Sequence, residues 1–391
     1  MQVDITDAGA VEAAFKTPWP PTGSTGPEPP LTVFNTVANI RFFERHPSLL
    51  PLSARVNVEG TKNVINSARS VGATILIYTS SSSIAVHSTR FWLWPWESEP
   101  KGFVQVIDDS DDLIPKRHSD FFSNYAASKS QGEKAVRDAD RSPSGPGILR
   151  TGCIRPGCGV YGPGGDMSTT VYFQNKRTHS WASSVLQSWV YVENCSVAHL
   201  LYEKLLIESS LGGSNPDIGG QAFTITNPGP PATYGDMHMT ITTLTKGEIT
   251  FPTISPTLIL SFAHLVELYD LTRHFLCSHW PRIGSMIPYG HIIMNVQPAM
   301  FALTGIHLIC DDSRARLPPH KGGLGYEGSW TTLEGFHTTV EEYFKSRNTA
   351  TEPVEVEAGN TTTLAMFNVG LVTTNCKGPN LESTRRIELP N

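Results

Sequence analysis

The chain has little basic charge and no long apolar run. Its 391 residues carry 30 Lys and Arg against 36 Asp and Glu, a formal charge of −6. This balance argues against a nucleic-acid partner and against a polybasic membrane anchor. No uninterrupted apolar run reaches the roughly 18 residues of a membrane-spanning helix. The nearest, residues 256–269, predicts a buried or interfacial amphipathic helix.

Other common signatures are also missing. The first ten residues, MQVDITDAGA, have neither the basic nor the apolar region of a secretory signal, so we expect an intracellular protein. The six cysteines form no Cys-x-x-Cys pair, which predicts reduced thiols and no disulfide framework or zinc site. The 13 histidines form no His-x-x-x-His pair, and we expect no metal site.

What the sequence does contain is an alternation of strand-like and helix-like segments. Residues 31–38, 73–79 and 147–156 are apolar runs of the length of buried parallel strands. Residues 54–71 have apolar side chains near helical spacing and separate the first two runs. The order predicts an α/β fold, a Rossmann-like doubly wound parallel sheet whose ligands bind beyond the carboxyl ends of the strands.

Irregular segments interrupt this pattern. Residues 17–30 are rich in proline and glycine and predict a long loop. Residues 85–118 predict a second irregular stretch, whose three tryptophans either pack locally or cap an apolar ligand. We divide the chain into a Rossmann-like part (1–165), an interleaved smaller C-terminal substrate-binding lobe (166–346) and a disordered tail (347–391).

A Tyr-x-x-x-Lys pair stands on a predicted helix over residues 123–139. Residues four apart share one helix face, so Tyr125 and Lys129 can point at the same spot. An ammonium near a phenol favours the phenolate and lowers the tyrosine pKa, which suits general acid–base chemistry. The serine run Ser80–Ser83 follows the strand over 73–79 and could hold a substrate oxygen.

Several segments carry a resemblance to one family, in that family's order. They are Asp4–Asp7, Val33–Ala38, Asn57–Val64, Tyr78–Ser81, Tyr125–Lys129, Arg155–Gly157, Val160–Gly162, Tyr191–Asn194, Leu324–Tyr326 and Glu334–Gly335. Together they resemble the 3β-hydroxysteroid dehydrogenase/isomerase branch of the extended short-chain dehydrogenase/reductases, in particular fungal sterol-4α-carboxylate 3-dehydrogenase-like proteins. The resemblance covers roughly residues 1–346.

This resemblance implies roles for individual residues. Tyr125 would be the acid–base, Lys129 would tune it and bind the nicotinamide ribose, and Ser81 would orient the substrate. The neighbouring serines 80, 82 and 83 compete with Ser81 for that role. The implied cofactor is NAD or NADP, with NAD favoured, and the implied cofactor-binding residues are Asp4, Ile5, Val37, Ala38, Thr79, Tyr125, Lys129 and Pro156. Asn57 would tie the catalytic helix to the neighbouring strand.

The sequence departs from the family at the start. A Gly-x-x-Gly-x-x-Gly helix opening, which would hold the cofactor pyrophosphate, does not precede Asp4. The literal Gly-x-Gly-x-x-Gly at Gly323–Gly328 follows no strand, and we reject it as a phosphate loop.

Three hypotheses about function therefore stay open. The first is an NAD(P)-dependent oxidoreductase acting on the 3β-hydroxyl of a sterol or steroid. The second is a non-catalytic remnant or truncated gene model. The third is a nucleotide-sugar epimerase or dihydroflavonol-reductase-like enzyme. The resemblance also implies a hydrophobic sterol-like substrate, a homodimer, and a place in the cytoplasm or peripheral to the endoplasmic reticulum membrane.

Overall fold

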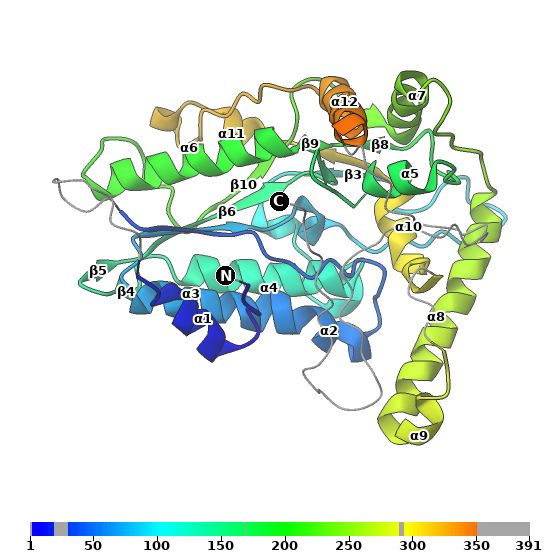
Figure 1. The fold of residues 1–391 in the computed structure, drawn as a ribbon, viewed down its shortest axis with the longest axis horizontal. Coiled ribbons are helices and arrows are strands. Elements are labelled where there is room, and N and C mark those ends of the chain that lie inside the picture. The colour runs from blue at the N-terminus through cyan, green and yellow to red at the C-terminus, as the bar shows by residue number, and fades with distance from the viewer. Residues whose placement is uncertain (1, 19–29, 168, 289–292, 350–391) are drawn as a thin grey trace.

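The computed structural model describes residues 2–18, 30–167, 169–288 and 293–349. Most of the predicted loop over 17–30 and nearly all of the predicted tail over 347–391 lie outside the described residues. The described chain forms layers of helices around a parallel sheet, with a second, smaller sheet beside it (Figure 1).

The main sheet confirms the predicted α/β class. Its four parallel strands lie in the order β1-β2-β6-β10, and Ile75 lies opposite both Thr32 and Arg150. The predicted buried runs supply the first three strands, and the region beyond residue 166 supplies the fourth, so the two parts interleave. The strands are β1 (Thr32–Asn35), β2 (Ile75–Thr79), β6 (Arg150–Pro156) and β10 (Ala222–Ile225).

Helices cover both faces of this sheet, which is why β2 has no polar face. Leu76 and Tyr78 pack toward α1 (Ala8–Phe15), α3 (Thr61–Ser70) and α4 (Asn124–Asp138). Ile75 and Ile77 point the other way, toward α6 (Val192–Ser210). Figure 1 shows α4 and α6 on opposite sides of the sheet. Asp7 caps α1, because its carboxylate accepts from the backbone N–H of Ala10.

The helix predicted over 54–71 is longer and contains a wider turn. It begins with α2 (Leu50–Ala54), continues through the π-helical segment η2 (Arg55–Gly60) and ends as α3. Asn57 lies in this π-helical segment and is fully buried. Its side chain donates to the Asn39 carbonyl (3.0 Å) and to the Ser128 hydroxyl (2.9 Å). Asn57 thus ties α4 to the segment that follows β1.

The second sheet was not predicted. Its strand β3 (Val104–Ile107) falls in the segment expected to be irregular, so that expectation is wrong for these four residues. Val104 and Val106 are 56% and 60% exposed, and an edge strand this open leaves little burial pattern in the sequence. The sheet order is β11 (Ala232–Thr233), β8 (Leu186–Gln187), β12 (His307–Cys310) and β3. Two-residue strands form two further pairs: β4 (Pro143–Ser144) with β5 (Gly147–Ile148), and β7 (Val160–Tyr161) with β9 (Val190–Tyr191).

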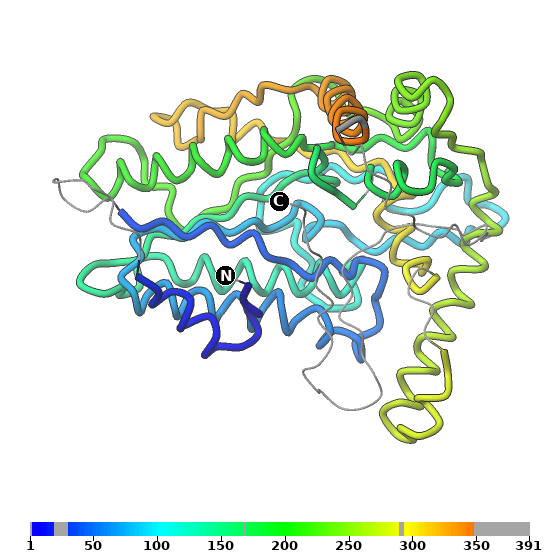
Figure 2. The backbone as a smooth tube through the Cα atoms, in the orientation of Figure 1, coloured from blue at the N-terminus to red at the C-terminus, as the bar shows by residue number. Residues whose placement is uncertain are grey.

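The remaining helices surround the second sheet. Figure 2 shows the helix near the end of the described chain, α12 (Thr332–Thr349), lying beside α7 (Tyr234–Leu244). Helix α8 (Pro256–His279) runs away from the body and carries α9 (Pro281–Gly284) at its end (Figure 1). Within the described ranges, no helix is both long and apolar enough to cross a bilayer. The other helices are α5 (Thr169–Asn175), α10 (Pro298–Thr304) and α11 (Ser313–Arg316).

Candidate active site

A cavity of about 780 Å³ opens at the carboxyl ends of β1, β2 and β6, where a doubly wound sheet binds its ligands. Its wall is mostly apolar, with a few polar groups at one end. The apolar lining comes from the main sheet, the following loops and α10: Phe34, Ile40, Phe42, Cys158, Val160, Met167, Trp189, Leu200 and Leu303. The polar end carries Thr79, Ser80, Ser81, Ser83, Tyr125, Lys129 and His199.

Tyr125 enters the cavity from the first turn of α4. Ser123 caps this helix by accepting from the Ala126 N–H, which fixes where the helix starts. Burial raises the pKa of Tyr125 to about 12, and a hydrogen bond with Ser81 offsets part of that rise. The expected acidification of this phenol by Lys129 is therefore wrong for this arrangement, because burial dominates.

Lys129 lies one turn along the same helix and is 1% exposed. Its ammonium donates to the Thr79 carbonyl oxygen at 2.5 Å and lies 4.1 Å from the centre of the Tyr78 ring. Burial lowers the pKa of Lys129 from 10.5 to about 7. The amine therefore holds its proton weakly and is anchored to the end of β2.

The serine run turns sharply after β2 and separates its members. Ser81 begins the short 3₁₀ helix Ser82–Ala85, and its hydroxyl lies 2.7 Å from that of Ser83. The Ser80 hydroxyl is buried and has no hydrogen-bond partner among the described residues. Ser82 is fully buried and receives a weak bond from the Cys310 thiol, away from the cavity lining. Among the four, Ser81 is the one in contact with Tyr125.

The structure brings together most of the residues predicted to bind a cofactor. Ala38, Thr79 and Pro156 line the cavity with Tyr125 and Lys129. The other three lie apart from its lining. Val37 is 44% exposed, Asp4 is exposed in a turn, and Ile5 packs against Gly60 while its carbonyl accepts from Asn63.

Sequence reasoning missed His199, which is buried on the opposite side of Thr79 from Lys129. Its Nε2 lies 2.7 Å from the Thr79 hydroxyl oxygen, and burial lowers its pKa. One signal was available. Val192, Cys195 and His199 recur at the spacing of one helix face, directly after the Tyr191–Asn194 segment.

The polar end of the cavity fits the nicotinamide and ribose end of a dinucleotide. It offers a buried ammonium, the hydroxyl groups of Thr79, Ser81 and Ser83, the Tyr125 phenol and the backbone turn at Pro156. The unpartnered Ser80 hydroxyl is a further hydrogen-bonding group that no described residue satisfies. Gly157, Gly159, Gly162 and Gly165 of the turn after β6 also line the cavity. This turn leads into β7 and not directly into a helix, so it does not present the helix N-terminus that holds a pyrophosphate in a dinucleotide-binding fold.

The rejected glycine motif lies elsewhere. Leu324 and Tyr326 insert into the core beneath α6, with exposed fractions of 1% and 0%. The Tyr326 hydroxyl donates to the Thr226 carbonyl at 2.8 Å. These glycines therefore shape a structural turn, and no residue of the motif lines the cavity.

The tryptophan cluster also lies outside the cavity lining. The rings of Trp94 and Trp96 stack with centroids 5.4 Å apart, and the Trp92 indole N–H donates to His264 on α8. All three are exposed. Of the two interpretations, local contact is the one seen.

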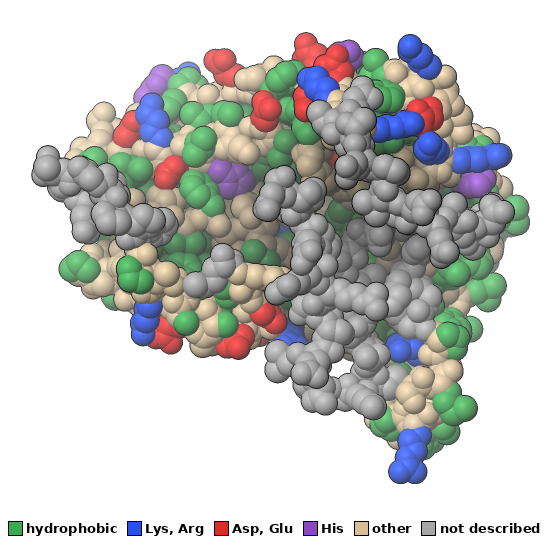
Figure 3. Space-filling view, viewed as in Figure 1, with side chains coloured by type: hydrophobic (Ala, Val, Ile, Leu, Met, Phe, Trp, Pro, Cys, Tyr) green, Lys and Arg blue, Asp and Glu red, His purple; other side chains and the backbone are tan. Residues whose placement is uncertain are grey.

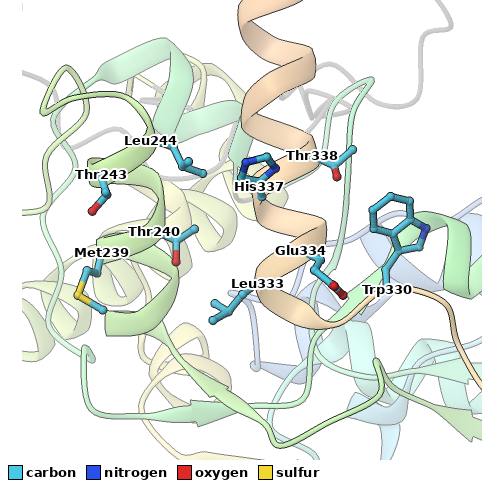
Figure 4. Close-up of a pocket in the computed structure, with 9 residues that line it drawn as sticks. All are labelled: Met239, Thr240, Thr243, Leu244, Trp330, Leu333, Glu334, His337 and Thr338. Carbon is cyan, nitrogen blue, oxygen red and sulfur yellow. The ribbon is translucent and has the colours of Figure 1, made fainter.

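A second hollow lies between α7 and α12 (Figure 4). Its lining is mainly apolar and threonine side chains, and it is open to solvent. Its larger polar side chains already have partners: the Trp330 indole donates to Glu193, Glu334 accepts from the backbone and hydroxyl of Thr331, and His337 lies 3.8 Å from Glu341. This hollow is therefore a weaker candidate than the cavity at the end of β2.

Solved structures confirm the fold. A UDP-glucose 4-epimerase from Thermotoga maritima aligns with a TM-score of 0.53 at 17% identity, covering 88% of this chain and 84% of that one. An epimerase from Methanothermobacter thermautotrophicus aligns with a TM-score of 0.54 at 16% identity, covering 89% and 79%. Identities this low establish a shared Rossmann-type architecture and nothing about substrate.

Sequence similarity defines the family. The model of the 3-beta hydroxysteroid dehydrogenase/isomerase family matches residues 52–248, a span that contains Ser81, Tyr125 and Lys129. This chain belongs to that family.

Curated relatives extend the comparison. The chain is 27% identical over 300 residues to the 3beta-hydroxysteroid-dehydrogenase/decarboxylase isoform 2 of Arabidopsis thaliana, covering 75% of this chain and 45% of that protein. It is 28% identical over 183 residues to the decarboxylating sterol-4-alpha-carboxylate 3-dehydrogenase of Candida albicans, covering 45% of each. The chain thus spans about half the length of the curated relatives it matches.

Proposed function

We propose that this chain carries the catalytic centre of an NAD(P)-dependent dehydrogenase that oxidises the 3β-hydroxyl of a sterol- or steroid-like substrate. One observation carries the proposal: Ser81, Tyr125 and Lys129 meet at the polar end of an otherwise apolar cavity. The family match and the names of its relatives support the choice of substrate.

Each residue has a defined task in this reaction. A bound nicotinamide coenzyme would supply the acceptor for the hydride that leaves C3 of the substrate. Tyr125 takes the proton of the 3-hydroxyl, so that the alcohol becomes a ketone. Ser81 holds the substrate oxygen beside the phenol. Lys129 holds the ribose end from its place at the end of β2. With a 4α-carboxysterol the product would be a β-keto acid, which loses CO₂ readily.

The cavity lining also bears on the epimerase alternative. Sugar-nucleotide substrates carry a diphosphate, which basic side chains usually bind. Among the described residues that line the cavity, Lys129 is the sole Lys or Arg, and it faces the Thr79 carbonyl. An apolar substrate therefore suits this lining better than a sugar nucleotide.

The test uses the purified chain with NAD⁺ or NADP⁺ and three substrates: a 4α-carboxysterol, a Δ5-3β-hydroxysteroid and UDP-glucose. We expect reduced nicotinamide to form with a sterol substrate, and Tyr125→Phe to lower kcat by about 10²- to 10⁴-fold while coenzyme still binds. Absence of both binding and turnover would favour the non-catalytic hypothesis. Conversion of UDP-glucose alone would favour the epimerase.

We further propose that α8 and α9 rest on a lipid surface. The acidic and arginine side chains of α8 face the protein body: Glu267 pairs with Arg45, Asp270 accepts from Gln297, and Arg273 is buried. The outward face is mainly apolar instead, which inverts the polarity of an ordinary surface helix. Its exposed apolar residues are Leu258, Phe262, Leu265, Leu268, Tyr269 and Phe275, with the uncharged Ser261 and Thr272 between them.

The end of this arm has the composition of a membrane interface. Exposed Trp280, Ile283 and Met286 surround the basic Arg282, and apolar side chains cover much of the projecting arm in Figure 3. Aromatic, aliphatic and basic side chains together favour the boundary between headgroups and acyl chains.

Vesicle flotation tests this placement. Wild-type protein is expected to float with vesicles of phosphatidylcholine and phosphatidylserine, and the double variant Leu265→Glu/Leu268→Glu to remain in solution. Leu211→Glu, at a still more exposed leucine directly after α6, is the control and should float. If the wild type stays in solution and sedimentation shows a dimer that the double variant lacks, the face binds a second copy of the chain instead. That result would also support the predicted homodimer.

A further inference from the structure

Thr79 is held from both faces of the sheet. It ends β2, between α4 on one side and α6 on the other (Figure 1). From α4, the Lys129 ammonium donates to the Thr79 carbonyl at 2.5 Å. From α6, the His199 ring lies 2.7 Å from the Thr79 hydroxyl oxygen. No other described residue at the polar end of the cavity is bonded to both covering layers in this way.

The contacts of His199 define which of its ring nitrogens carries a proton. Nδ1 lies 2.8 Å from the Cys195 carbonyl oxygen, which can only accept a hydrogen bond, so Nδ1 is the donor. Burial lowers the pKa of His199 and keeps the ring neutral, so Nε2 has a free lone pair. The Thr79 hydroxyl must then donate its proton to Nε2.

Because the Thr79 hydroxyl donates its proton to His199, it can act only as a hydrogen-bond acceptor toward the cavity. A hydroxyl that has given its one proton can only accept further hydrogen bonds. Thr79 lines the cavity, so its remaining lone pairs are available to a ligand. A hydroxyl free to rotate would serve a donor or an acceptor equally, whereas this one selects a donor.

We propose that His199 is a positioning residue that makes Thr79 a hydrogen-bond acceptor for the nicotinamide end of the coenzyme. The partner on the coenzyme is an N–H or O–H donor, either the carboxamide or a ribose hydroxyl. The inference rests on the proposed function, because the coenzyme is the ligand it names.

The first experiment determines which ring nitrogen of His199 carries the proton, and it needs no coenzyme. In ¹⁵N-histidine-labelled protein, two-bond ¹H–¹⁵N spectra should show His199 as the Nδ1–H tautomer, assigned by its absence from His199→Phe. The Nε2 resonance should shift in Thr79→Val, which keeps the side-chain shape and removes the hydroxyl. An Nε2–H tautomer, or no shift in Thr79→Val, would overturn the proposal.

The second experiment measures coenzyme affinity through the fluorescence of NADH. His199→Phe and Thr79→Val should each weaken the Kd about tenfold, the effect of one neutral hydrogen bond. The double variant should be no weaker than either single variant, because the two residues act as a unit. His199→Gln, whose amide can both donate and accept, should recover most of the affinity.

A matched control separates this role from simple loss of a buried histidine. His238 is equally buried, on α7, where its ring stacks on Phe251 at 4.0 Å. His238→Phe should leave the Kd unchanged. Additive losses in the double variant would show that His199 acts through general contact and would overturn the proposal.

Two further measurements separate coenzyme binding from the orientation of Thr79 by His199, and the carboxamide from a ribose hydroxyl as the hydrogen-bond donor. If the wild type binds no NADH, the proposed function fails, whereas the NMR result still decides whether His199 orients Thr79. Nicotinic acid adenine dinucleotide, which lacks the carboxamide N–H, identifies the donor. If its Kd does not respond to Thr79→Val, the carboxamide is the partner; if it weakens as NADH does, a ribose hydroxyl is.

Discussion

Replacing Lys129 with methionine should abolish dehydrogenation and make the protein more stable. The ammonium is 1% exposed, and its polar contact is a single carbonyl oxygen. A buried amine in such a place costs free energy whenever it is charged. Methionine has a similar length and no charge, so it removes that cost while filling the same space.

The magnitude follows from the displaced pKa of Lys129, lowered by burial from 10.5 to about 7. Each unit corresponds to about 1.4 kcal/mol, so the charged amine destabilises the fold by an amount on the order of 5 kcal/mol. Below pH 7 the lysine is protonated in both states, and the full cost is present. Between pH 7 and 10.5 the unfolded chain binds the extra proton, so stability rises with pH and the cost fades.

Urea unfolding followed by tryptophan fluorescence, at several pH values from 6 to 10 (roughly the window of the shift), measures the difference between Lys129→Met and wild type. We expect a large advantage for the variant near pH 6 that shrinks steadily above pH 7. Lys134→Met, on the exposed face of the same helix, is the control and should differ from wild type by under about 1 kcal/mol at every pH. An advantage that does not change with pH would refute the reasoning.

Two further predictions concern the contacts that α4 makes with η2 and β6. Gly132→Ala would place a Cβ 2.3 Å from the Asn57 carbonyl and force α4 away from η2, so we expect a loss of about 1–3 kcal/mol in the free energy of unfolding. Gly9→Ala, with 3.4 Å to its nearest neighbour, should be neutral or slightly stabilising in the same urea assay. Arg155→Met leaves the Glu133 carboxylate buried without its bidentate partner and should cost about 3–5 kcal/mol. Adding Glu133→Gln should recover part of that loss, and a double variant as unstable as Arg155→Met would contradict this account.

The main sheet could be predicted from sequence because its strands are buried on both faces. Residues 75–78 are apolar without alternation, which is typical of a parallel strand between two helical layers. Helix α4 was also predictable: the sequence indicates a helix over residues 123–139, and the structure has it over Asn124–Asp138 with the Tyr-x-x-x-Lys pair in its first turns. The pairing of Ser81 with Tyr125 was expected from the family resemblance, whereas the serine run alone left Ser80, Ser82 and Ser83 as alternatives.

Other features depend on contacts that no local pattern records. Strand β3 is short and exposed, and it exists because β12, some 200 residues later, pairs with it in parallel register. His199 is a single histidine in a helix, and its contact with Thr79 exists only because α6 packs against the end of β2. The raised pKa of Tyr125 also could not be predicted from the local sequence. Spacing predicted the neighbouring ammonium, whereas burial decided the direction of the shift.

The π-helical turn Arg55–Gly60 gives this segment room for one residue more than a regular α-helix of the same height. A one-residue deletion here would therefore convert the wide turn into α-helix and leave Val64, Ile65 and Ala68 facing the core. What it would remove is the position of Asn57, whose side chain reaches the Asn39 carbonyl and the Ser128 hydroxyl from inside the turn. The extra residue thus serves the link between this segment and α4 and is not needed for the packing of α3.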